Sequence, residues 1–284
     1  VITVDDATVI TVHDAAVITV LYAAVITVHD AAVITVHDAA LITVHDTADI
    51  NVDDAAVITV DDVAVITVLY AAVITVHDAA LITVNDTIGI TVLYAAVITV
   101  HDAASITVLY AAVITVDTVV VITVDDAAVF TVDDAIGIAV HDATVIIVLY
   151  AAVITVLYAA VITVHDAAVM TVDTVVAITV EDADIFRVDD GTVMTVNALS
   201  CFGDANVMTV HDADVITVHD ATGITVHDAT VISVHDAAQV FRVTRLADSE
   251  GAESSVVEYE LLDCEPATLL HQHLGGGEVV PLGD

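Results

Sequence analysis

An eight-residue unit repeats through most of this chain, and it constrains the fold more than any other feature. Its clearest copy is Val33–Ala40, with the sequence Val-Ile-Thr-Val-His-Asp-Ala-Ala. Twenty-five copies follow one another in phase from Val1 to Ser200, and four more run from Val207 to Ala238. Because an array grows by units, residues 1–238 are predicted to form one stack of repeats and not a domain around a central core.

The first half of each octad has the pattern of a half-buried strand. Position four is Val in all 29 copies and position two is Ile, Phe or Met, whereas positions one and three also accept Asp, Gly, Asn or Arg. This alternation in β-branched residues predicts that positions two and four point inward. No proline occurs before Pro266, as a continuous ladder of backbone hydrogen bonds requires.

The second half of the octad, typically His-Asp-Ala-Ala, is predicted to form a bend. Aspartate at position six can accept hydrogen bonds from nearby backbone N–H groups, and small residues at positions seven and eight let chains approach closely. A four-residue strand cannot bury its apolar face alone, so the octads must stack. The sequence therefore predicts an all-β fold, a β-solenoid with two or three octads per coil, of which two is favoured. Open ends of such an array also predict end-to-end self-association.

The repeat is interrupted once and then ends. Six extra residues between two octads predict a loop insertion near 197–206. Residues 239–284 are predicted to be a separate, short C-terminal β segment. It consists of strand-like residues 239–245, a polar linker over 247–255 and a strand over 256–262.

The charge of the chain excludes several classes of partner. Acidic residues outnumber basic ones by 42 to 3, and the formal net charge is −39. This composition excludes nucleic acid, whose phosphates need Lys and Arg, and it favours cations and cationic partners. The run Val145–Val164 is uncharged over 20 residues. It consists of ordinary octads without a basic flank, so a membrane span is not expected.

The His-Asp doublets are the first candidate for chemistry. They are freely replaced by Asp-Asp, Asn-Asp or Leu-Tyr, which is typical of turn residues on a solvated edge. The alternative is cation binding, because stacked coils bring carboxylates to about 4.8 Å, where two of them repel by about 0.9 kcal/mol even in bulk water. A divalent cation such as Ca²⁺ would relieve this repulsion. The residues predicted to form such a ladder are Asp14, Asp30, Asp38 and Asp46.

Two further side-chain patterns recur at fixed octad positions. Threonine at position three, as in Thr11, Thr19, Thr27 and Thr35, resembles in residue type the water-ordering face of some ice-binding solenoids. The Leu-Tyr pairs at positions five and six begin octads at residues 17, 65, 89, 105, 145 and 153. They are either a packing variant or, where they align, an exposed apolar patch suited to self-association or a partner.

The C-terminal segment carries a different motif. After the predicted strand 256–262 the chain has His271-Gln272-His273 and then Glu278. This arrangement resembles the first metal motif of cupins. The resemblance covers about 30 residues and implies a truncated cupin start, with His271, His273 and Glu278 as ligands of a transition metal. The second cupin motif is not in this sequence.

The function predicted from these patterns is that of an elongated acidic structural or interaction protein that binds cations. Extracellular or cell-surface localisation is favoured. No nucleophile elbow or phosphate-cradling glycine loop supports catalysis. Three alternatives stay open: a metal-dependent cupin-type C-terminus on a repeat stalk, an ice- or surface-binding threonine ladder, and a translated tandem repeat without selected function.

Overall fold

The structure, a computed structural model, describes residues 1–198, 207–219, 223–235, 241–244, 256–259 and 267–270. Its elements are β1 (Ile2–Ala198), β2 (Val207–His219), β3 (Gly223–His235), β4 (Phe241–Thr244), β5 (Val256–Tyr259) and β6 (Ala267–Leu270). All described residues except Val1 lie in strands, so the prediction of an all-β fold is confirmed. The described part of the chain contains no helix long and apolar enough to cross a membrane.

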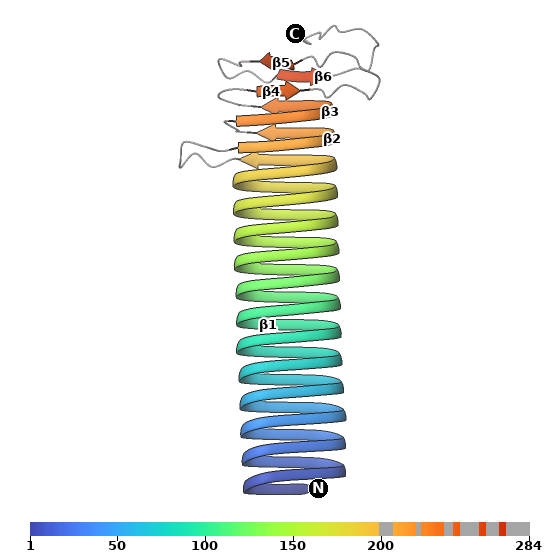
Figure 1. Cartoon of the computed structure of the whole chain (residues 1–284), viewed down its shortest axis with the longest axis vertical. Coiled ribbons are helices and arrows are strands. Elements are labelled where there is room, and N and C mark those ends of the chain that lie inside the picture. Colours follow the sequence, from blue (N-terminus) through green and yellow to red (C-terminus); the bar gives the residue numbers. More distant parts are fainter. Residues whose placement is uncertain (199–206, 220–222, 236–240, 245–255, 260–266, 271–284) are drawn as a thin grey trace. The chain divides into compact units, whose positions relative to one another are not determined.

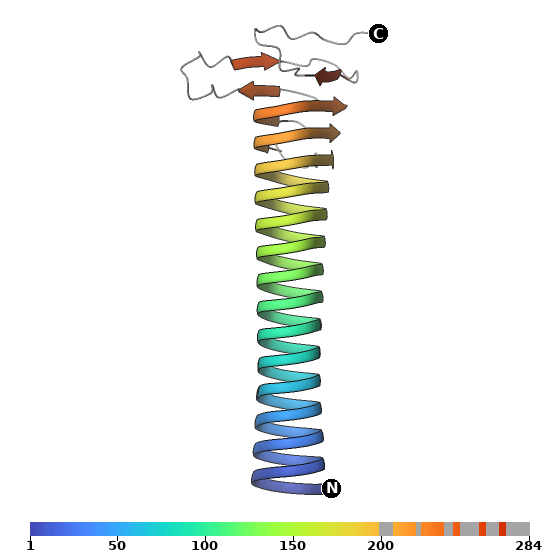
Figure 2. The ribbon, with the colours of Figure 1, turned by 90° about the vertical axis from the view of Figure 1, so that its right-hand side faces the viewer.

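Strand β1 is unusual because it extends over 197 residues, many times the length of an ordinary strand. The chain divides into two compact units, Val1–Ala143 and Thr144–Asp284, and their boundary falls inside β1. Within each unit the ribbon of β1 winds repeatedly, and each turn lies beside the next in both views (Figure 1, Figure 2). The octads therefore bend at regular intervals, and the residues of each bend still belong to the strand.

Neighbours on successive turns are sixteen residues apart. The imidazole rings of His13 and His29 are parallel, with centroids 4.8 Å apart, which matches the spacing of adjacent β-strands. The parallel ladder between β2 and β3 has the same offset, since Val207 lies opposite Gly223. Sixteen residues are two octads, so the octads fall into two columns. Column one contains the octads that begin at residues 1, 17, 33 and so on; column two contains those that begin at 9, 25, 41 and so on.

The ladder continues in the same columns beyond the predicted insertion. Ile185 of β1 lies opposite Val207 of β2. This pair is 22 residues apart, six more than the pairs of β2 and β3, which matches the six residues that the sequence inserts. The predicted loop itself lies mostly outside the described residues.

The strands after the last octad join the same sheet. β4 pairs in parallel with the first part of β3, β5 pairs antiparallel with β4, and β6 pairs antiparallel with the second part of β3. The strands expected near 241 and 256 are therefore present as β4 and β5. The boundary predicted at residue 238, and the linker over 247–255, stay predictions.

The core is built from three positions of each octad. From Val9 onward, positions two and four are buried wherever the structure describes the burial of their side chains; Ile34 and Val36, for example, are 0% exposed. This confirms the inward direction predicted for both positions. Position seven is buried as well in most octads, as at Ala39 and Val63, whereas position eight faces outward. Each octad thus has a long side over positions one to five and a short side over positions six to eight, with position seven turned inward.

Threonine at position seven shows what a polar side chain requires at this inward-facing position. The Thr87 hydroxyl lies 3.4 Å from the backbone carbonyl of Gly89, to which it donates a hydrogen bond. The Thr47 hydroxyl oxygen is buried without a partner, the only such side-chain atom in the part of the chain that the structure describes. Because a buried, unsatisfied hydroxyl costs about 1–3 kcal/mol, position seven favours Ala or Val, and these residues occupy most octads.

Candidate functional site

Acidic side chains at position six form a ladder along one corner of column two. Asp14, Asp30 and Asp46 occupy three successive turns, and all three have a positive backbone φ, of 56°, 53° and 49°. Aspartate tolerates this left-handed conformation better than most residues, so it suits the corner on these three turns. Asp62 and Asp78 continue the same column on the next two turns.

The ladder predicted from the sequence is therefore only partly brought together. Asp14, Asp30 and Asp46 share a corner, whereas Asp38 belongs to column one and lies at the opposite corner. Among the described residues, no group of three or more His, Cys, Asp or Glu side chains is arranged to hold a metal ion. The corner is thus a row of separate carboxylates and not a closed coordination site.

Histidines at position five form a second row beside these aspartates. The rings of His13, His29 and His45 are parallel, and each pair of neighbours has centroids 4.8 Å apart. In the second unit, His211 and His227 stack in the same way at 4.5 Å. The rows arise because identical octads bring identical side chains into register on adjacent turns.

Histidine also pairs with an acid wherever the acid follows it by one turn. In all four such places among the described residues, a ring nitrogen lies 2.5–3.2 Å from a carboxylate oxygen. The pairs are His37–Asp53, His45–Asp61, His101–Asp117 and His165–Glu181. These side chains are 36–53% exposed, so each pair contributes no more than about 1 kcal/mol.

The Leu-Tyr octads align on adjacent turns in one place within the first unit. Tyr94 and Tyr110 both belong to column two, and their rings are parallel with centroids 5.1 Å apart. The two tyrosine residues are 49% and 43% exposed. Tyr94 and Tyr110 thus form the aligned, exposed pair that was one of the two alternatives predicted for the Leu-Tyr octads. Tyr22 and Tyr70, in contrast, have no tyrosine one turn away.

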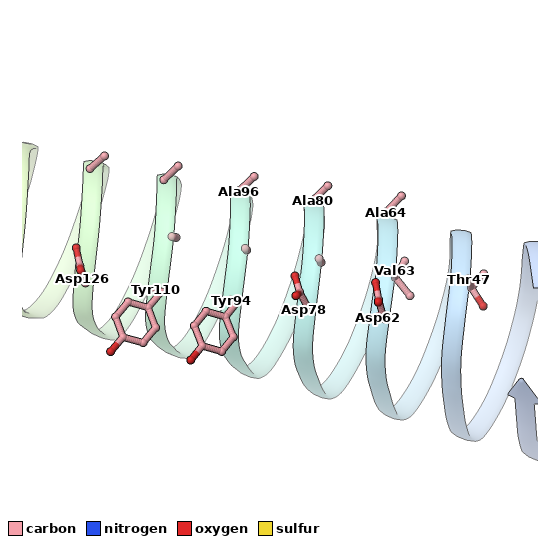
Figure 3. A pocket seen from close by; sticks show the side chains of 15 residues that line it. Thr47, Asp62, Val63, Ala64, Asp78, Ala80, Tyr94, Ala96, Tyr110 and Asp126 are labelled. Carbon is pink, nitrogen blue, oxygen red and sulfur yellow. The ribbon is translucent and has the colours of Figure 1, made fainter. Parts of the chain in front are cut away.

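An open groove of about 770 Å³ runs along the short side of column two in the first unit. Figure 3 shows its acidic and aromatic edge, where Asp62, Asp78, Tyr94, Tyr110 and Asp126 project from successive turns in one direction. Alanines at position eight, among them Ala64, Ala80 and Ala96, point the other way (Figure 3). Sequence reasoning missed this groove, because nothing in a single octad shows which octads share a column.

The cupin-like residues His271, His273 and Glu278 lie outside the described residues, so their role as metal ligands stays a prediction. Strand β6 ends at Leu270, directly before them. Comparisons with protein-family models, with curated proteins and with solved structures find no match to this chain.

Proposed function

We propose that the octads form a β-solenoid with two octads per coil, which serves as an acidic structural or interaction scaffold. The observation that carries this proposal is the sixteen-residue register, which recurs in ring stacking, in His–carboxylate pairs and in the parallel ladder of β2 and β3. Stacking buries Ile and Val at positions two and four of one turn against the next. Length then grows with octad number at constant cross-section, which suits a spacer or stalk.

The corners of this scaffold would attract cations through the negative electrostatic potential of their aspartates. Five aspartates of column two, from Asp14 to Asp78, follow one another at the spacing of one turn. Their neighbours repel by about 0.9 kcal/mol per pair in water at about 4.8 Å, and the net charge of −39 adds to this. A cation held only by the folded ladder relieves the repulsion and stabilises the fold.

We expect millimolar Ca²⁺ at low ionic strength to raise the melting temperature of the chain. The triple variant Asp14→Asn, Asp30→Asn and Asp46→Asn should lose much of this shift and should be the more stable protein without Ca²⁺. Asparagine suits the substitution because it also adopts positive φ. Thermal unfolding followed by far-UV circular dichroism measures both effects.

The matched control removes three carboxylates that have no acidic counterpart one turn away, by Asp6→Asn, Asp49→Asn and Asp134→Asn. This variant should keep most of the Ca²⁺ shift. A wild-type midpoint that Ca²⁺ leaves unchanged, or an equal loss in both triple variants, would contradict the cation ladder while leaving the scaffold intact.

A further inference from the structure

We propose that the groove of column two binds an extended peptide segment of a partner protein through two arginine side chains. The two sites for the guanidinium groups lie at either end of the Tyr94–Tyr110 pair. Each site consists of a tyrosine ring and the carboxylate on the next turn, Asp78 beside Tyr94 and Asp126 beside Tyr110. This inference adds a specific binding site to the scaffold and does not depend on the cation ladder.

The side chains at the edge of the groove match a cation. One turn advances by about 4.8 Å, so a group beside the ring of Tyr94 also reaches the carboxylate of Asp78. Aromatic rings attract cations within about 6 Å of their centroid. A second hollow of about 500 Å³ adjoins Tyr94, and Asp61, Asp62, His77 and Asp78 line the rest of it. Three of the five residues that line this hollow are aspartates, so the negative charge beside Tyr94 is not that of Asp78 alone.

The carboxylates are available to a ligand. Within the described residues, no hydrogen bond or ion pair engages Asp62, Asp78 or Asp126. Guanidinium suits these sites better than ammonium, because its planar group stacks on a ring and donates two parallel hydrogen bonds to one carboxylate. An anionic partner is excluded by the same row of charges.

The spacing of the two sites indicates an extended ligand. Asp78 and Asp126 are three turns apart, which is about 14 Å at the strand spacing. An extended peptide rises by about 3.3 Å per residue and presents every second side chain on one face, so residues four apart lie about 13 Å apart and point the same way. Alanines along the other edge, such as Ala80 and Ala96, leave room for the peptide backbone. The ligand class is thus an Arg-x-x-x-Arg segment in extended conformation.

Fluorescence anisotropy with a labelled Arg-Ala-Ala-Ala-Arg peptide tests the proposal on the full chain at physiological ionic strength, where distant charges are screened. We expect one peptide per chain. The double variant Tyr94→Ser and Tyr110→Ser should weaken binding roughly tenfold, the equivalent of losing about 1.4 kcal/mol. Asp78→Asn with Asp126→Asn should weaken it at least as much, because each guanidinium loses a charged acceptor.

Matched controls come from column one, outside the groove. Tyr22→Ser with Tyr70→Ser removes two exposed rings that are not paired, and Asp38→Asn with Asp102→Asn removes the same charge. Both controls should bind the peptide as the wild type does. Equal weakening in groove and control variants, several peptides bound per chain, or binding of a linear polyamine but not of the arginine peptide would overturn the proposal. Far-UV circular dichroism checks that each variant keeps its strand content.

Discussion

Replacing Ile74 by aspartate is expected to destabilise the array by about 4 kcal/mol or more, because it removes a large buried side chain and places a carboxylate in the core. Ile74 occupies position two and is 0% exposed. Its neighbours on the adjacent turns, Ile58 and Ile90, are also buried, so a carboxylate at residue 74 would be shielded from water. Urea unfolding followed by far-UV circular dichroism measures the loss.

The control for this substitution is Thr75→Asp, on the next residue of the same octad. Thr75 lies at position three, on the outward side of the strand, so the new carboxylate stays hydrated. We expect a cost below about 1 kcal/mol, as is usual for surface substitutions. Similar costs for the two variants would show that positions two and three do not face opposite sides.

The second large effect concerns two adjacent alanines that look equivalent in the sequence. Ala79 is 3% exposed, whereas Ala80 faces solvent at the edge of the groove. We expect Ala79→Asp to cost about 3 kcal/mol, because it buries a charge and overfills a tight corner. Ala80→Asp should change the free energy of unfolding by less than about 1 kcal/mol. The same urea titration compares them.

The leucine substitutions separate the two causes. Ala79→Leu adds volume without charge and should still cost about 1–3 kcal/mol, whereas Ala80→Leu should be nearly neutral. If both substitutions at residue 79 proved as mild as those at residue 80, position seven would not point inward, and the arrangement described for the short side of the octad would be wrong.

Much of the strand architecture was predictable because it is local. Invariant Val at position four and Ile, Phe or Met at position two define a buried face by simple alternation. Position seven was not predictable in this way, since alternation stops at a corner and both following residues are usually Ala. Only the bend itself shows that Ala39 turns inward and Ala40 outward.

The candidate sites depend on which octads become neighbours, and near-identical octads carry little information on that point. The sixteen-residue register brings Asp14, Asp30 and Asp46 to one corner and leaves Asp38 at the other. The same register pairs Tyr94 with Tyr110 and so forms the aromatic part of the groove edge. A coil of three octads would have placed different residues side by side, which is why the sequence left these sites open.

Disulfide cross-linking between alanines at position eight tests the two-octad coil most directly. In a background with Cys201→Ser and Cys264→Ser, the pair Ala64→Cys and Ala80→Cys is sixteen residues apart. A disulfide needs Cα atoms about 4.4–6.8 Å apart, and adjacent turns meet this requirement.

The matched pair is Ala56→Cys with Ala80→Cys. These alanines are 24 residues apart, equally exposed, and neighbours only if three octads make one coil. Mild oxidation at low protein concentration, followed by peptide mapping, should yield the intramolecular 64–80 disulfide and leave the 56–80 pair as free thiols. A 56–80 disulfide without a 64–80 disulfide would contradict the sixteen-residue coil.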